Sequence, residues 1–435
     1  MPKRLLLAPA FVLAASCMPN SAGVSPPSDG IFFPTAASLT PDGDHLAVAS
    51  SNFDLAYSNG TVLLLDLDRV ETELVSGCPE EGCEPVEESQ FVLEAETVRT
   101  GSFASFLETA PEGSRMYLTV RGDTSLTYLD MDPSADEGRK LTCFDREDPP
   151  RSRKCDSKHR VTSGLSADPY AITIKRQSYP HDTGGETVVD WIFVSHLTSG
   201  QVSVFEAEVN PLDRDLPPRP VLEDESFPLG VTAVELHPLT SGTFYAATRN
   251  SRSLHTFSFA TDPLNFDGST RIALGRTIPI DVLGDGHDSR DLVFSTDGNM
   301  AFVSNRSPNS LVLVDTSLDA NGWPRNRTVG AVELDAGPSL LTVWSPPGWD
   351  TEWIYATCYN MDRVYVIDPV LRMAVDVILT GNGPHTLITD TERLLGYLVN
   401  FIESTISVVD LDPASTSFND VRATIGIPEK VRSND

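Results

Sequence analysis

One pattern recurs along this chain from residue 33 to the end. Each copy has an apolar strand, a turn that often contains Pro and Asp-Gly, a second strand that begins with an aromatic residue, a polar turn and an alternating apolar strand that often ends in Asp. The template fits seven segments, which begin at Leu39, Ala110, Trp191, Phe244, Leu292, Trp353 and Leu387. The chain therefore contains seven copies of one unit.

The spacing of the copies indicates what the unit is. The third strands of the last two copies end at Asp368 and Asp410, 42 residues apart. This step matches the ~40–45 residues of one four-stranded propeller blade, and the longer steps indicate insertions. Two packed β-sandwiches are the competing fold, but they would not explain one template along the whole chain. We predict an all-β, seven-bladed β-propeller of four-stranded blades over residues 31–435.

The repeat resembles the YVTN-type, WD-like propeller family. Copies in that family read roughly G-x-x-P, an apolar strand, S-P-D-G, an L-Y-V-A-N strand and a V-x-V-I-D strand. The corresponding segments here include LTPDGDHLAVAS from Leu39 and LVFSTDGNMAFVSN from Leu292. The resemblance covers nearly all of the chain after residue 30 and implies the fold. It leaves the function open, because such propellers include binding modules, surface-layer repeats and hydrolases.

The start of the chain is typical of a secretory signal peptide, which we predict for residues 1–16. Lys3 and Arg4 form a short positive region, and the apolar run of residues 5–13 is too short to span a bilayer as a helix. Export from the cytoplasm is therefore expected.

The segment LAASC, which ends at Cys17, resembles the bacterial lipobox. This resemblance implies acylation of Cys17 and anchoring in a lipid bilayer, and Met18 after it implies the outer membrane. The alternative is an ordinary signal peptide whose cleavage leaves Cys17 as a thiol. Residues 17–30 are small, polar and Pro-rich, and we predict a lipid anchor followed by a flexible tether.

The chain is strongly acidic. It has 62 Asp and Glu residues against 32 Lys and Arg residues, and its formal net charge is -30. Such a surface repels nucleic acid and anionic lipid headgroups, so neither is an expected partner. No block of like charges stands out, and the acidity is typical of solubility in salty or extracellular surroundings. We expect a monomer.

Two pairs of cysteines are close in sequence, Cys78 with Cys83 and Cys143 with Cys155. In an exported protein they predict two local disulfides that close loops. Zinc is the alternative, but neither pair has the two-residue spacing or the His partners of a zinc site. Cys358 lies in an apolar stretch and is expected to be buried.

The predicted topology gives the ring two different faces. Segments that link successive blades share one face, called here the link face, with the loops between second and third strands. Turns of the T-P-D-G kind lie on the opposite face, together with both cysteine loops and the insertion at residues 177–190. We therefore expect a ligand on the link face, at the mouth of the central channel.

Arginines recur there at one template position, the residue after the second strand, in three blades: Arg121, Arg249 and Arg306. They are joined by three further candidate ligand-binding residues, His196, Asp291 and His385. Guanidinium groups bind carboxylates and phosphates in a forked geometry, so this set is suited to a small anion. The alternative is that each Arg pairs with a carboxylate of the adjoining blade and only fastens the ring.

The sequence supports catalysis less well, and no catalytic residue is predicted. The segment Gly381–His385, GNGPH, resembles the G-x-G-P-R-H segment of seven-bladed lactone hydrolases but lacks its Arg. A lactonase-like hydrolase that uses His385, Asp291 and the arginines is therefore an alternative.

No metal site or cofactor is predicted, and calcium is considered only as a structural ion. Asp285 and Asp288 belong to an acidic cluster with Asp281 and Asp291, but the spacing is not that of an EF-hand loop. A plain solvated acidic turn is the other interpretation. The preferred function is an anchored binding or scaffold module for a protein, a glycan or a small anionic ligand, and a structural envelope or adhesion protein is a further alternative.

Overall fold

The computed structural model describes residues 23–79, 82–145, 150–180, 186–209, 216–224, 227–240, 242–260, 271–284, 287–335 and 337–428. The predicted signal peptide at residues 1–16 lies outside these residues, as do Cys17 and Asp285. Within the described ranges, no helix is long and apolar enough to cross a membrane.

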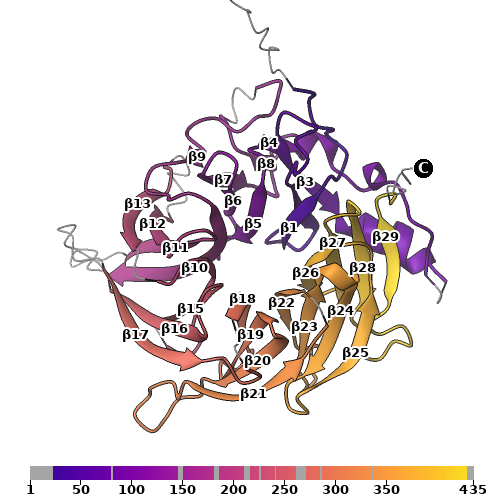
Figure 1. Cartoon of the computed structure of the whole chain (residues 1–435). Helices are drawn as coiled ribbons and strands as arrows, with labels where there is room; N and C mark the ends of the chain where they lie inside the picture. The colour runs from indigo at the N-terminus through magenta and orange to yellow at the C-terminus, as the bar shows by residue number, and fades with distance from the viewer. Residues whose placement is uncertain are drawn as a thin grey trace, which may run out of the picture.

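The described residues form seven antiparallel sheets around one axis (Figure 1). Each sheet is built from strands that follow one another in the chain, which confirms the predicted seven-bladed propeller with four-stranded blades. Blade one contains β1 (Pro34–Leu39), β2 (His45–Ser50), β3 (Gly60–Asp66) and β4 (Val98–Thr100). Blade two contains β5 (Ala104–Thr109), β6 (Arg115–Val120), β7 (Ser125–Met131), β8 (Leu141–Thr142) and β9 (Arg160–Val161). Blade three contains β10 (Pro169–Pro180), β11 (Glu186–His196), β12 (Val202–Glu208) and β13 (Arg219–Asp224).

The remaining blades follow the same plan. Blade four contains β14 (Val231–Leu236), β15 (Thr243–Thr248), β16 (Ser253–Ala260) and β17 (Arg271–Pro279), and blade five contains β18 (His287–Phe294), β19 (Met300–Ser307), β20 (Asn309–Asp315) and β21 (Arg327–Glu333). Blade six contains β22 (Pro338–Trp344), β23 (Trp353–Cys358), β24 (Arg363–Asp368) and β25 (Met373–Leu379). Blade seven contains β26 (Pro384–Asp390), β27 (Leu395–Asn400), β28 (Thr405–Asp410) and β29 (Val421–Ile425). The described helical turns are α1 (Leu67–Arg69), η1 (Val70–Leu74), η2 (Val75–Gly77), η3 (Glu88–Gln90), η4 (Glu94–Glu96) and η5 (Tyr359–Met361).

Strand alternation makes the core, because successive side chains point to opposite faces of a blade. In β3, Leu63 packs with Tyr397 of blade seven, whereas the next residue, Leu64, packs with Met116 of blade two. All four side chains are fully or almost fully buried. Each blade thus buries one apolar row against each neighbour, and the ring is held by blade-on-blade packing.

Both predicted disulfides are present. Cys143 is joined to Cys155, and the loop between them separates β8 from β9, two short strands that together form the outer edge of blade two beside β7. Cys78 is joined to Cys83 in the loop after β3. Cys358 is free and buried, as expected.

The ring closes without exchange of a strand between its ends. Blade one contains only N-terminal strands and blade seven only C-terminal ones. The cysteine loop after β3 crosses instead to the outer edge of β29: Val86 donates its N–H to the carbonyl of Thr424 (3.0 Å) and accepts from the N–H of Gly426 (2.8 Å). A loop of blade one therefore extends the sheet of blade seven.

Every innermost strand has a register irregularity near its start. A bulge inserts extra backbone and re-aims the side chains beside it. Residues at or beside these bulges include Tyr170, Arg290, Asp291 and His385. The irregularities lie between Pro34/Ala36, Ala104/Leu107, Pro169/Ile172, Val231/Ala233, Ser289/Asp291, Pro338/Leu341 and Pro384/Leu387.

Candidate functional site

A second regularity shapes the link face. One residue at or just before the start of each inner strand, called here the link residue, has a positive φ: Phe33, Phe103, Asp168, Gly230, Asp288, Gly337 and Gly383. In six blades its carbonyl accepts a hydrogen bond from the residue after the second strand of the same blade, as in Arg121 N–H to Phe103 O (3.0 Å) and Phe401 N–H to Gly383 O (2.9 Å). Link residues and the arginine position therefore lie side by side around the mouth.

Each of the three template arginines reaches the start of the next blade. Arg121 pairs through Nε with Asp168, the link residue of blade three. Arg249 donates from Nε to Oδ1 of Asp288, the link residue of blade five (3.1 Å). Arg121 and Arg249 thus follow the alternative interpretation of the sequence, in which each Arg pairs with a carboxylate of the adjoining blade.

Arg306 is different because the link residue of the next blade is Gly337. It donates from Nε to the carbonyl of Pro338 (2.9 Å) and from Nη2 to the hydroxyl of Ser339. Among the described residues, no Asp or Glu forms an ion pair with it, although its side chain is partly buried. Within the described part of the mouth, Arg306 is therefore a guanidinium that has no carboxylate as a direct ion-pair partner.

The cationic groups gather in one part of the mouth. Burial lowers the pKa of Arg306, and the charges of Arg290 and Arg249 lower it further, against the opposite effect of Asp288 and Tyr170. These residues come from blades three, four and five, so two of the three predicted arginines, Arg249 and Arg306, lie within electrostatic reach of each other.

Tyr170 stands among these arginines. Burial raises the pKa of its phenol, and the charges of Arg290, Arg306 and Arg121 counteract that rise. Its ring packs edge-on against Phe106, with ring centroids 5.0 Å apart. The phenol therefore lies within electrostatic reach of these guanidinium groups.

The structure does not place His196 at the mouth. The residue is fully buried, and its ring nitrogens lie 3.1 Å from the carbonyl oxygen of Ala167 and 2.9 Å from the hydroxyl of Ser203. Burial lowers the pKa of the imidazole. His196 thus has both ring nitrogens occupied inside the protein.

His385 and Asp291 lie in the inner strands of blades seven and five, and no hydrogen bond joins them. Burial lowers the pKa of His385 to about 4, and Nδ1 lies 3.2 Å from the hydroxyl of Thr386. Asp291 accepts from the backbone N–H of Leu292 and of Leu341, both at 2.8 Å, and burial raises its pKa to about 7. The second of these bonds connects blade five to blade six.

Two carboxylates that the sequence reasoning missed lie further along the axis. Glu108 of β5 and Glu235 of β14 occupy the same position of their inner strands, with Thr173 of β10 at the corresponding place between them. Desolvation among the surrounding blades raises the pKa of Glu108 to about 7, although the residue is exposed to solvent. Burial raises the pKa of Glu235 strongly, and the charges of Asp291 and Glu108 raise it further. Water therefore reaches an acidic zone inside the ring.

The calcium alternative finds no support in the described part of the acidic turn. Asp288 accepts from Arg249 through Oδ1 and from Arg290 through Oδ2 (3.0 Å), so both of its oxygens face guanidinium groups. Across the described ranges, no group of three or more His, Cys, Asp or Glu side chains is arranged to hold a metal ion.

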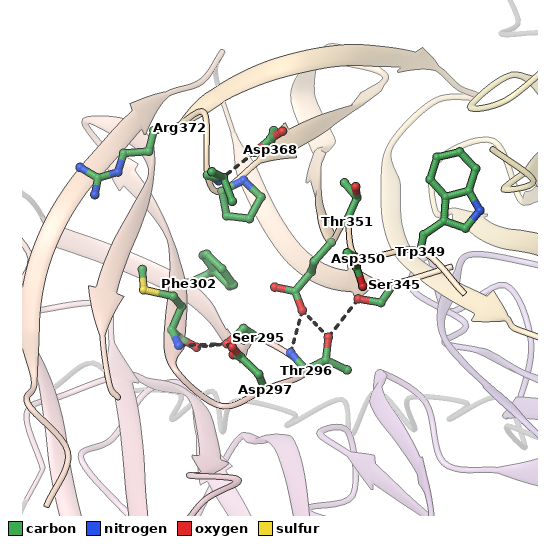
Figure 2. A pocket seen from close by; sticks show the side chains of 14 residues that line it. Ser295, Thr296, Asp297, Phe302, Ser345, Trp349, Asp350, Thr351, Asp368 and Arg372 are labelled. Carbon is green, nitrogen blue, oxygen red and sulfur yellow. Dashed lines mark hydrogen bonds between the residues drawn. The ribbon is translucent and has the colours of Figure 1, made fainter. Parts of the chain in front are cut away.

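A separate cavity of about 740 Å³ opens on the T-P-D-G face between blades five and six (Figure 2). Glu352 points into the turn of blade five and accepts from the N–H of Thr296 (2.7 Å), whose hydroxyl also lies 3.0 Å from that of Ser345. Arg372 points away toward the carbonyl of Val329 (2.8 Å). The carboxylate of Glu352 is thus used to join the two blades.

No family model matches the chain, and no curated protein matches its sequence. Solved structures do match. A hydrazine synthase chain from Kuenenia stuttgartiensis is 15% identical with a TM-score of 0.56, covering 90% of this chain and 99% of that one. Candidate 6-phosphogluconolactonases from Bacteroides fragilis and Bacteroides uniformis are 14% and 16% identical, with TM-scores of 0.55 and 0.50, and cover 90% and 83% of this chain and 98% and 87% of theirs.

At these identities the likeness shows the fold alone. The chain is a seven-bladed propeller, and its structural neighbours include lactonase-like proteins. The YVTN-type resemblance stays a prediction, because no family model supports it.

Proposed function

We propose that this propeller is a binding module that takes a small anionic ligand at the link-face mouth, with Arg306 as its main contact. The observation that carries the proposal is the lack of any carboxylate partner for Arg306 among the described residues, at the one arginine position followed by a glycine link residue. A partly buried cation without a counter-charge is unfavourable, and a bound carboxylate or phosphate would neutralise it.

Neighbouring groups complete the proposed site. Nε of Arg290 is buried and has no hydrogen-bond partner among the described residues. Tyr170 adds a hydroxyl, and the low pKa of His385 keeps its imidazole neutral at pH 7. No observation favours the lactonase-like alternative over ligand binding, because His385 and Asp291 are hydrogen-bonded to different groups.

The test is a titration with inorganic phosphate at constant ionic strength, read out by calorimetry and by thermal shift. Phosphate is expected to raise the Tm of the wild type, because a ligand that binds only the native state stabilises it. Arg306→Gln is expected to weaken binding about tenfold or more, since a hydrogen bond to a charged group contributes ~1.5–3 kcal/mol.

Arg327→Gln is the matched control, because Arg327 lies exposed on the outer strand β21, and it should bind phosphate as the wild type does. Equal affinity in Arg306→Gln and wild type would contradict the proposal. So would a wild type that phosphate stabilises no more than chloride at the same ionic strength.

We further propose that the protein is exported and anchored to the outer membrane through acylated Cys17, on the basis of the lipobox resemblance. In a bacterial host, the wild type should partition into the detergent phase and incorporate labelled palmitate. Cys17→Ala should do neither, and Cys358→Ala should behave as the wild type. Detergent partitioning of Cys17→Ala equal to that of the wild type would contradict the anchor.

A further inference from the structure

Aromatic side chains form a continuous arc on the link face beside the arginines. The ring of Phe401 in blade seven lies 5.5 Å from that of Phe33, 5.3 Å from that of Phe53 and 6.0 Å from that of Tyr359 in blade six. Phe53 also lies 5.9 Å from Phe103 of blade two. We call these five residues the aromatic arc, and it spans blades six, seven, one and two.

The arc is open to solvent. The side chain of Phe53 is 55% exposed, and two further apolar residues beside it, Leu55 and Ile402, are 59% and 51% exposed. Phe53 and Leu55 belong to the loop between β2 and β3, which stands on the link face. An exposed apolar patch of this kind on a strongly acidic protein indicates a binding surface.

Two rings of the arc occupy positions that the backbone disfavours. Phe33 and Phe103 are link residues with φ of 45° and 61°. Three other blades have glycine there, Gly230, Gly337 and Gly383, which adopts this conformation without strain. The fold therefore does not require a side chain at this position, and a bulky residue held in it is typical of functional sites.

The two ends of the arc meet the arginines. Tyr359 follows the second strand of blade six, and the charge of Arg306 acts on its phenol. At the other end, Arg121 directly follows the second strand of blade two and donates its N–H to the carbonyl of Phe103. The mouth is thus divided into an aromatic part and a cationic part that adjoin each other.

We propose that the ligand is an organic anion with a ring, whose carboxylate or phosphate binds Arg306 while its ring packs on the aromatic arc. This inference rests on the proposed function for the anionic group and adds the apolar group. Aromatic rings prefer edge-on or offset contact with centroids 4.5–7 Å apart, and the exposed ring of Phe53 and the neighbouring Phe401 present such surfaces.

The experiment compares three probes by calorimetry: inorganic phosphate, phenyl phosphate and benzyl alcohol. Wild type is expected to bind phenyl phosphate at least fivefold more tightly than inorganic phosphate, and benzyl alcohol most weakly. Phe53→Ser and Phe33→Gly should lose this preference and keep their affinity for inorganic phosphate. Arg306→Gln should lose affinity for both phosphates.

Phe33→Gly is expected to remove the ring without disturbing the fold, because three other blades have glycine at this position. Its Tm is expected to stay within a few degrees of that of the wild type. If it falls further, Phe53→Ser decides, since Phe53 is mostly exposed.

The outcomes separate the two proposals. Equal affinity of the wild type for phosphate and phenyl phosphate would overturn the aromatic part and leave the anion site intact. Preference for phenyl phosphate that is independent of Arg306 would overturn the anion site and leave the arc. Tight binding of benzyl alcohol, equal to that of phenyl phosphate, would show that the mouth takes an apolar group without the anion.

Discussion

Replacement of Arg393 by alanine is expected to lower the free energy of unfolding by about 3–5 kcal/mol, the range for breaking a buried ion pair. The side chain of Arg393 is 8% exposed and lies where blade seven meets blade one. Its Nη1 donates to Asp390 of blade seven (3.0 Å) and to the carbonyl of Gly43 in blade one (2.8 Å), and its Nη2 pairs with Asp68.

The size of the effect follows from what the substitution leaves behind. The side chain of Asp390 is 4% exposed and would keep a buried charge without its ion-pair partner. The carboxylates of Asp390 and Asp68 together hold the pKa of Arg393 above its ordinary value, in spite of burial. The measurement is urea unfolding followed by circular dichroism.

Arg69→Ala is the control for this experiment. Arg69 pairs with Glu73 four residues away, and both side chains are about half exposed, so its loss should change the free energy of unfolding by less than ~0.5 kcal/mol. A loss below about 1 kcal/mol in Arg393→Ala would show that the seam between the two terminal blades does not depend on this residue.

That seam is also the part of the fold about which the repeat pattern predicts least. The repeat predicts the number of blades, because each copy places apolar residues at alternating positions of its second and third strands. Besides the packing of blade one on blade seven, closure includes the hydrogen bonds of Val86 to Thr424 and Gly426, and Val86 belongs to a loop that the repeat template does not contain. A template read from repeats cannot show what a unique loop contacts.

For the candidate site, the sequence predicted the arginine column but not how its members differ. The deciding signal is one template position in the next blade: Asp168 and Asp288 follow the paired arginines, whereas Gly337 follows Arg306. Reading the two positions together would have singled out Arg306.

The aromatic arc was missed for another reason. Phe33 and Phe103 look like ordinary core residues at the start of apolar strands. Only the backbone conformation reveals that they stand at positions where glycine is favoured. His196 was predicted at the mouth but is buried. It shares its template position with Thr248 and Asn305, and a polar residue at this position does not reveal from the sequence whether its side chain points into the mouth or into the blade.

The acidic zone inside the ring leads to the second large effect. Because the pKa of Glu235 is raised in the folded state, the folded protein binds this proton more tightly than the unfolded chain does. Stability is therefore present at acid pH and declines as the pH rises through the folded pKa. Glu108 and Asp291, each with a pKa raised to about 7, contribute in the same direction.

Histidines act in the opposite direction at lower pH, so the experiment must avoid their range. His385 has its pKa lowered to about 4, and the stability that it contributes as a neutral side chain is lost as the pH falls from about 6.5 toward that value. Urea midpoints measured from pH 6.5 to 8.5 exclude most of this effect. In that interval wild-type stability is expected to fall, by up to about 1.4 kcal/mol per pH unit for each proton held only by the folded state.

Glu235→Gln removes the titrating group and keeps its shape, so its stability should decline less steeply over the same interval and exceed that of the wild type at pH 8.5. Glu223→Gln, at an exposed position of the outer strand β13, should reproduce the wild-type slope. If Glu235→Gln also followed the wild-type slope, this carboxyl would not be the group whose raised pKa makes the stability depend on pH.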